Sequence, residues 1–256
     1  MLPHSAAQKL RRADQHISDL NSLISAYFNQ RPFKVVKRFN ADTGNLSLSI
    51  KCEIPIPDQI PIILGDAIHN LRAVLDHAYF SIITRNTSRR DNIQFPIYRP
   101  DNKKDVLGRR LVKLAGEKVC EAIEYCQPEP GGRYLIYELD AIDVEDKHRA
   151  ILIAARSGYI PAALLSVVLP EIGVQFTGPG IFRFTGDGDD VFSVAMPPIH
   201  PITKHGTFEN EVKVATRFDL IFGEGNPFAS REIIPTINEL RQNVATAAET
   251  ICKAAL

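Results

Sequence analysis

The chain has 256 residues, of which 45% are hydrophobic and 23% are charged, and this composition excludes disorder, collagen and coiled coil as descriptions of the whole molecule. Thirty Lys and Arg residues balance thirty Asp and Glu residues, so no net charge draws the molecule to nucleic acid or to an anionic membrane. The length allows one large domain or two small ones with a real hydrophobic core.

The sequence contains no segment that predicts insertion into a membrane. The longest apolar stretch, residues 159–170, is interrupted by Pro161 and is shorter than the roughly 20 residues that a bilayer requires. Residues 1–16 lack the apolar segment of a secretory signal. The four cysteines are sparse and lack a zinc-like spacing, so we expect reduced thiols in a cytoplasmic protein.

Helical periodicity dominates the first half of the chain. Residues 33–39 and 46–54 interrupt it, because they alternate apolar and polar side chains around the turn sequence Asp42-Thr43-Gly44-Asn45, which predicts a β-hairpin. The Pro- and Gly-rich segment 127–132 is the strongest break. The predicted helices of this half cover residues 5–30, 59–84, 101–126 and 133–156.

Strand patterns replace the helical ones after Gly158, and a final amphipathic helix is predicted at 230–254. The predicted strands cover residues 164–169, 174–176, 181–184, 191–195 and 211–222. The sequence therefore predicts an α+β fold. A helical bundle over 1–156 carries an inserted β-hairpin at 33–54, and an antiparallel sheet with a C-terminal helix follows over 157–256. We expect the last helix to pack back on the bundle, so that the whole forms one compact unit.

One face of the helix predicted at 59–84 is rich in titratable and amide side chains. An apolar stripe opposite this face consists of Leu64, Ile68, Leu71 and Leu75. The polar face carries Asp66, His69, Asn70, Arg72, Asp76 and His77. Because His69, Arg72 and Asp76 are spaced i, i+3 and i+7, they line one edge of the helix. Two imidazoles, a guanidinium and two carboxylates on one face indicate a functional site rather than an idle surface.

A second polar cluster lies in the sequence from Asp140 to Arg149. Asp143, Asp146 and Lys147 share one edge of the predicted helix, at i, i+3 and i+4. An antiparallel packing of this helix against the first would bring the two polar edges together in one cleft.

Arg72 and His77, with four residues between them, match an R-x4-6-H motif. In this respect residues 1–30 and 58–156 resemble the HEPN superfamily of helical ribonucleases and nucleotide-binding domains. The resemblance implies a metal-independent ribonuclease of a conflict or toxin type. In it, His77 is the acid or base at a ribose 2′-hydroxyl and Arg72 stabilises the charge of the phosphorane. Asp76 is grouped with them as a candidate catalytic residue.

The same resemblance implies RNA or a nucleotide as the ligand, and a homodimer, since such domains commonly pair two motifs. The chain departs from the family at Ala73, where the family usually has Asn, Asp or His immediately after the Arg. This departure leaves open a binding role without catalysis. No P-loop and no G-x-G-x-x-G sequence follows a predicted strand, so we expect no cofactor.

The segments GDAIHNLRAVLDHAYF, FPIY and DKHRAIL also resemble a widespread group of bacterial proteins without an established activity. This wider resemblance spans most of the chain and suggests that the polar residues of both clusters belong to one site. The candidate binding residues of that site are His69, Asn70, Asp146, Lys147, His148 and Arg149.

Two other interpretations remain open. A metal site is one, because Asp66-x-x-His69 and Glu145-x-x-His148 repeat the acid-x-x-His spacing of metal-binding helical bundles. The other is structural: a polar ladder that includes Arg72 and Asp76 would fix the register of packed helices, in a non-catalytic binding or scaffold protein.

Overall fold

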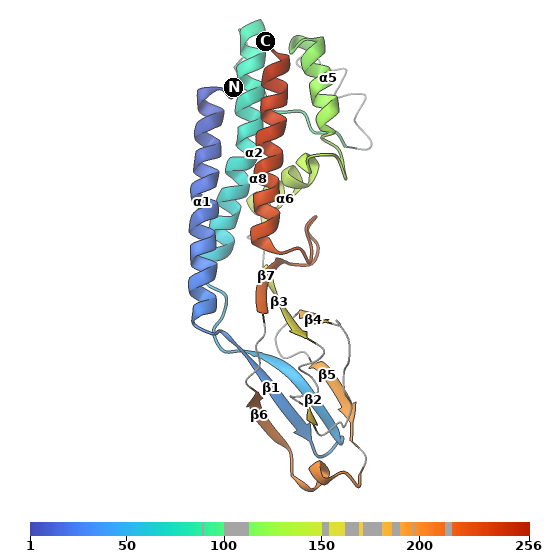
Figure 1. Ribbon diagram of the computed structural model, residues 1–256. Coiled ribbons are helices and arrows are strands. Elements are labelled where there is room, and N and C mark those ends of the chain that lie inside the picture. The colour runs from blue at the N-terminus through green and yellow to red at the C-terminus, as the bar shows by residue number, and fades with distance from the viewer. Residues whose placement is uncertain are drawn as a thin grey trace. The chain divides into compact units, whose positions relative to one another are not determined.

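The computed structural model has the α+β architecture that the sequence predicts (Figure 1). It describes residues 1–88, 90–99, 113–149, 154–161, 169–170, 181–185, 190–196, 198–212 and 217–256. At residues 148–149, 154–161, 181–185, 190–192 and 217 the description covers the backbone alone.

The helices are α1 (His4–Asn29), α2 (Gln59–Asn86), α5 (Glu117–Cys126), α6 (Ile136–Arg149) and α8 (Ile233–Ala254), with a short 3-10 helix η2 (Pro201–Lys204). The strands are β1 (Phe33–Asn40), β2 (Asn45–Cys52), β3 (Ala154–Pro161), β4 (Ile181–Thr185), β5 (Asp190–Ala195), β6 (Phe208–Val212) and β7 (Arg217–Phe222). The predicted N-terminal helix, β-hairpin, second helix and C-terminal helix are confirmed.

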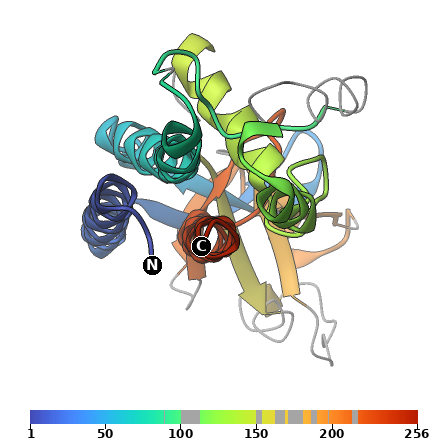
Figure 2. The ribbon, with the colours of Figure 1, turned by 90° about the horizontal axis from the view of Figure 1, so that it is seen from above.

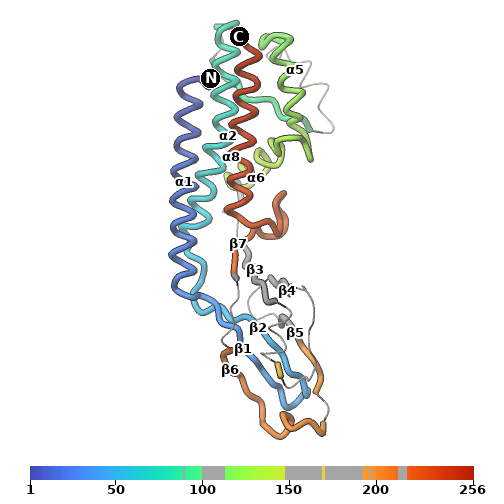
Figure 3. Tube along the Cα trace, viewed as in Figure 1, coloured from blue at the N-terminus to red at the C-terminus, as the bar shows by residue number. Residues whose placement is uncertain are grey.

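Contacts divide the chain into two compact units. The helical unit comprises Met1–Leu23, Asp58–Ile153 and Phe222–Leu256, and the sheet unit comprises Ile24–Pro57 and Ala154–Ile221. This division differs from the predicted parts 1–156 and 157–256, because late strands pair with both edges of the hairpin. β5 pairs with β2, and β6 pairs with β1, so blue and orange strands lie side by side in Figure 3.

The core of the helical unit is built around α2. Leu64, Ile68, Leu71 and Leu75 are fully buried, which confirms the predicted apolar stripe. Helix α8 runs beside α2 and buries its own apolar face, as expected for a helix that packs on the bundle (Figure 2). Its buried residues include Ile237, Leu240, Val244, Ala247 and Ile251. Apolar burial of this kind is the main force that holds such helices together.

The sheet unit contains an antiparallel sheet with the strand order β5-β2-β1-β6. Gly44, with a φ of +70°, forms the tight turn between β1 and β2, and its N–H donates to the Asn40 carbonyl over 2.8 Å. The register of β1 and β6 places Phe39 opposite Phe208 and Lys37 opposite Asn210. These opposed pairs share one face of the sheet, since alternate residues of a strand point the same way.

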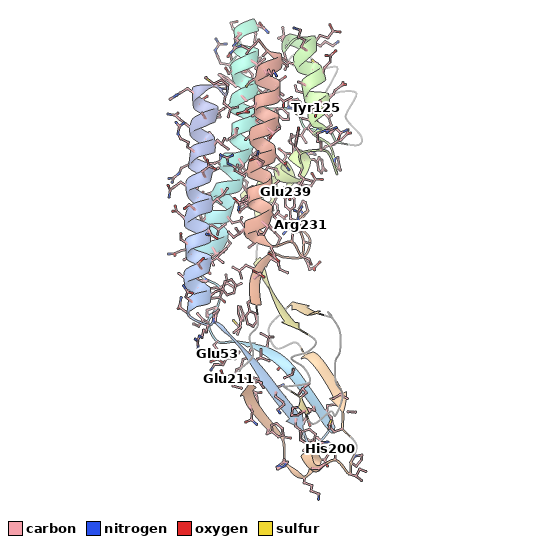
Figure 4. All side chains as sticks on the ribbon, in the orientation of Figure 1. Glu53, Tyr125, His200, Glu211, Arg231 and Glu239 are labelled. Carbon is pink, nitrogen blue, oxygen red and sulfur yellow. The ribbon has the colours of Figure 1, made fainter. Side chains whose placement is uncertain are left out.

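The opposite face of this sheet carries a ladder of ion pairs. Arg38 contacts Glu209 over 2.7 Å, and Lys34 contacts both Glu53 (3.2 Å) and Glu211 (3.7 Å). Figure 4 shows Glu53 and Glu211 close together at one end of the strands and His200 at the other end. One face of the sheet thus carries ion pairs, and the other carries the aromatic pair Phe39 and Phe208.

The boundaries between the helical and strand-rich parts need correction. The predicted helix 133–156 is wrong at residues 154–156, because residues 154–161 form β3 and pair with β4, while residues 150–153 lie outside the described part of the chain. A short apolar segment is compatible with either a helix or a strand, and here pairing with β4 makes it a strand. The single strand predicted at 211–222 is also wrong, since β6 and β7 belong to separate sheets.

Other predicted elements fall partly outside the described residues. Strands at 181–184 and 191–195 are confirmed by β4 and β5. The predicted strand 174–176, most of the strand 164–169 and the first part of the helix 101–126 lie outside the described residues. Within the part of the chain that is described, no helix combines the length and apolar character needed to cross a bilayer.

Candidate functional site

Helices α2 and α6 bring the two predicted polar clusters together. His69 Nδ1 lies 3.0 Å from Asp143 Oδ1, and Arg72 Nε lies 2.7 Å from Asp140 Oδ1. We call this region the α2–α6 polar interface. It comprises Asp66, His69, Asn70, Arg72 and Asp76 of α2 and Asp140, Asp143, Asp146 and Lys147 of α6.

Arg72 is the buried centre of this interface. Its Nε donates to Asp140 Oδ1, its Nη1 to Asp76 Oδ1 over 2.6 Å, and its Nη2 to the carbonyl oxygen of Phe95 over 3.3 Å. Only 7% of the side chain is exposed. All three guanidinium nitrogens are thus engaged, and Arg72 cannot reach a substrate without breaking these bonds.

The charge of Arg72 is maintained despite its burial. Desolvation acts to lower the pKa of the guanidinium, but the carboxylates of Asp76 and Asp140 outweigh it and the pKa is raised. A buried cation between two carboxylates contributes little net stability by itself. Removing the cation alone would leave two uncompensated negative charges.

Asp76 connects α2 to the segment after it. Its Oδ1 accepts the Arg72 hydrogen bond and also one from the backbone N–H of Phe95, over 2.8 Å. The Phe95 ring is buried and meets Tyr79 edge to face, with ring centroids 6.1 Å apart. Arg72 and Asp76 therefore fix the segment that contains the FPIY sequence.

His69 is the accessible partner in a pair with the buried Asp143. The His69 side chain is 50% exposed, whereas that of Asp143 is 4% exposed. The second oxygen of Asp143, Oδ2, accepts from Lys147 Nζ over 2.5 Å, and Lys147 is itself 46% exposed. A buried carboxylate thus holds an accessible imidazole and an accessible ammonium side by side.

Asp146 lies against the backbone of α2 at Gly65. A Cβ at position 65 would come within 2.5 Å of Asp146 Oδ2, so only glycine leaves room for this carboxylate. Burial raises the pKa of Asp146, and the nearby carboxylates of Asp143 and Asp66 raise it further. The glycine in the middle of α2 is therefore explained by packing on α6.

Helix α1 contributes to the edge of the interface. Lys9 Nζ donates to Asn70 Oδ1 over 3.4 Å, and Asn70 Nδ2 donates to the Asp66 carbonyl over 2.8 Å. His16 is buried on α1, and burial lowers its pKa, as does the charge of Arg12. Asn70 thus acts as a link between α1 and α2.

His77 does not share the edge of Arg72. At about 100° per residue, five positions separate the two side chains by roughly 140° around the helix. His77 is half-buried, and Arg72 is buried at the α6 side. The acid–base role of His77 stays a prediction, whereas the structure brings His69 and not His77 to the carboxylates of α6.

The remaining predicted residues divide into two groups. Asp146 and Lys147 lie at the interface, but the side chains of His148 and Arg149 are outside the described part of the chain. Among the side chains that are described, no three His, Cys, Asp or Glu residues converge on a point that could hold a metal ion. The set Asp66, His69, Glu145 and His148 therefore has no support as a metal centre from its described members.

No family model, curated protein or solved structure matches the chain.

Three residues that the structure makes central, Asp140, Asp143 and Phe95, were not predicted to be catalytic or binding residues. Asp143 and Asp140 were visible as carboxylates on the polar edge of the α6 sequence, one and two turns before Lys147. Phe95 could not be found from the sequence, since it participates through its backbone N–H and carbonyl groups. The spacing of acids on α6 was the available signal for the first two.

The arrangement separates a structural part from an accessible part. Arg72 is bonded to Asp76 and Asp140, and these residues join three segments of the helical unit. His69 keeps one imidazole nitrogen, Nε2, that is not used in the Asp143 contact. An imidazole oriented by a buried carboxylate is suited to accept and donate a proton.

Proposed function

We propose that the helical unit cleaves RNA phosphodiester bonds without a metal ion, with His69 as the residue that transfers the proton. The observation that carries the proposal is the half-exposed His69 ring held through Nδ1 by the buried Asp143 carboxylate. RNA as the substrate comes from the R-x4-H resemblance at Arg72 and His77. A homodimer and a cytoplasmic location belong to the same proposal.

In this reaction His69 Nε2 accepts the proton of a ribose 2′-hydroxyl. The 2′-oxygen attacks the adjacent phosphorus, the 5′-oxygen of the next nucleotide leaves and takes a proton from water, and a 2′,3′-cyclic phosphate forms. Asp143 stabilises the imidazolium that results, and it fixes the ring so that Nε2 is the acceptor.

Charge stabilisation in this proposal comes from Lys147 rather than from Arg72. The Lys147 ammonium is accessible and lies on the carboxylate that orients His69, whereas the Arg72 guanidinium is committed to three acceptors. An ammonium beside the reacting phosphate would lower the energy of the phosphorane. Arg72 then acts through the fold, by holding α2 against α6.

The test is an RNA-cleavage assay in EDTA with four proteins: the wild type, His69→Ala, Asp143→Asn and His77→Ala. We expect His69→Ala to lower the rate by about 10²–10⁴-fold, because this is the usual contribution of a general base. Asp143→Asn should also lower the rate, since it favours the wrong tautomer of the ring. The products of the wild type should carry 2′,3′-cyclic phosphate ends.

His77→Ala is the matched control, because it removes an imidazole from the same helix two turns away. A rate within about threefold of the wild type is expected for it, with circular dichroism to verify the fold of each variant. Loss of cleavage in His77→Ala with retention in His69→Ala would return the acid–base role to His77. A wild type that cleaves no RNA would overturn the catalytic proposal.

A non-catalytic binding or scaffold protein is the second candidate, and the full engagement of the buried Arg72 guanidinium favours it. A buried guanidinium whose three nitrogens all donate to fixed acceptors holds the helix register and takes no part in a reaction. Under this alternative, neither the wild type nor His69→Ala cleaves RNA, and variants of Arg72 change only the stability of the fold.

A further inference from the structure

A pocket of about 670 Å³ opens on one face of the four-stranded sheet, and all of its lining residues belong to the sheet unit. Its volume lies within the range of pockets that hold small organic ligands. The residues that line it are Lys37, His200, Pro201, Ile202, His205, Gly206, Thr207, Phe208 and Asn210.

The strand register explains why these side chains meet. Lys37 of β1 pairs with Asn210 of β6, and Phe208 lies two residues before Asn210, so all three face the same side of the sheet. The segment that contains η2 precedes β6 and forms the other wall. The ion-pair ladder of the sheet, with Arg38 and Glu209, lies on the opposite face.

The lining combines hydrogen-bond donors with apolar surface. Lys37, His200, His205 and Asn210 can all donate, and none of the nine described lining residues is acidic. Ile202 and Phe208 add apolar contact area. A wall of hydrogen-bond donors that includes the Lys37 ammonium, beside an apolar floor, fits a small organic anion.

The η2 wall is held in one conformation by its own hydrogen bonds. His200 Nδ1 accepts from the Ile202 N–H over 3.2 Å, which leaves Nε2–H as the donor of the neutral ring. The single hydroxyl hydrogen of Thr203 is shared between the carbonyl oxygens of Pro198 and His200, which lie 2.8 and 2.7 Å from Oγ1. Thr207 Oγ1 accepts from Ala41 N over 3.0 Å and ties the wall to the β1–β2 turn. A preformed site loses little entropy on binding.

We propose that this pocket binds a small organic anion, a carboxylate or phosphate monoester with an apolar or aromatic body. Lys37, His200 and Asn210 receive the anionic group, and Ile202 and Phe208 contact the body. The proposal does not depend on the function proposed for His69, because the pocket belongs to the other compact unit.

The test is a titration of the full chain, followed by ¹H–¹⁵N NMR. The probes are benzoate and phenyl phosphate, with neutral benzamide and inorganic phosphate as comparisons. We expect both aromatic anions to shift the amides of Lys37, Thr207 and Asn210. Benzamide should bind at least about tenfold more weakly than benzoate, because it lacks the charge. Inorganic phosphate should bind more weakly than phenyl phosphate, since it lacks the apolar body.

Two variants localise the binding. Lys37→Met should weaken the binding of benzoate by about tenfold, whereas Lys34→Met, on the same strand but the opposite face, should change it by less than about twofold. His205→Ala removes a donor from the exposed η2 wall and should weaken binding as well, and its spectrum verifies that the sheet is folded. A stronger response to benzoate than to phenyl phosphate identifies a carboxylate as the natural group, and the reverse identifies a phosphate.

The proposal fails if neither aromatic anion shifts these amides at about 10 mM. It also fails if benzamide binds as well as benzoate, or if Lys34→Met and Lys37→Met weaken binding equally. Each of these results concerns the sheet unit alone, and none bears on the cleavage assay.

Discussion

The Oδ1 atom of Asp76 accepts a hydrogen bond from the backbone N–H of Phe95 over 2.8 Å, and the backbone carbonyl of Phe95 accepts one from Arg72. The two side chains therefore hold both polar backbone groups of Phe95. Asp140 completes the arrangement from α6, at 2.7 Å from Arg72 Nε. One arginine thus joins three segments that are far apart in the sequence.

Replacement of Arg72 by alanine should destabilise the protein severely. Asp76 and Asp140 would remain at the interface without their cation, and breaking a buried pair in this way costs about 3–5 kcal/mol of unfolding free energy. Urea denaturation monitored by circular dichroism measures the loss. The matched control is Arg241→Ala, which breaks a more exposed contact with Asp14 and should cost less than about 1 kcal/mol. Equal losses in the two variants would show that the burial of Arg72 is not important.

Asp146→Asn should stabilise the protein at neutral pH. The pKa of Asp146 is raised in the folded state above its ordinary value of 3.8, so the folded state binds more protons than the unfolded state just above that pH. The stability that the protonated Asp146 carboxyl contributes is fully present below pH 3.8, its ordinary pKa. This stability is lost as the pH rises through the raised pKa of the folded state.

Because this carboxylate is partly exposed, solvent screening limits the gain from Asp146→Asn to about 0.5 kcal/mol at pH 7. Melting curves at pH 3 and pH 7 measure it, and the advantage of the variant should disappear at pH 3. Glu145→Gln, which also removes a negative charge from α6, gives the effect of charge loss outside the contact with Gly65. A variant that is less stable than the wild type at pH 7 would contradict the interpretation.

Gly65→Ala should have different effects in two backgrounds. Alanine favours a helix by about 1 kcal/mol relative to glycine, but in the wild type its Cβ would displace the Asp146 carboxylate. We expect little net change in the wild type and a stabilisation of about 0.5–1 kcal/mol when Asp146 is also alanine. A double-mutant cycle measures this coupling from unfolding free energies. The same effect in both backgrounds would mean that Gly65 and Asp146 do not interact.

Cys126 should resist alkylation while the protein is folded. Burial raises the pKa of its thiol to about 12, although Arg133 acts in the opposite direction, so the thiolate is rare at pH 8. Peptide mass spectrometry after iodoacetamide treatment should show modification of Cys126 only in denaturant. The partly exposed Cys52 serves as the internal comparison and should react first. Comparable rates at the two cysteines in the folded protein would refute the prediction.

The sequence predicted the elements whose signals are local. The stripe from Leu64 to Leu75 has helical spacing over many turns, and the turn at Gly44 has typical hairpin chemistry, so both α2 and the β1–β2 hairpin were found. It also placed two polar clusters on α2 and α6. The sequence predicts one shared site if the two helices pack against each other. In the structure the two clusters are in contact.

The sequence offered a structural Arg72–Asp76 ladder only as one of several interpretations, and no local pattern could decide for the burial of Arg72. Hydrophobic periodicity treats a charge as exposed, and the burial of this one depends on Asp140 and Phe95, which lie far along the chain. The strand at 154–161 was missed for a related reason. This strand pairs with β4, which comes later in the sequence, and no local sequence pattern predicts that pairing.

The division of the chain into interleaved segments has a consequence for its synthesis. The helical unit is made of the beginning, the middle and the last segment of the sequence, with the sheet unit interposed twice. Helix α2 emerges from the ribosome long before α8, on which part of its apolar surface packs. Until Ile233–Ala254 has been translated, that surface has no native partner. Nascent chains are therefore open to chaperone binding and to aggregation over most of translation, and closure of the bundle is a late event.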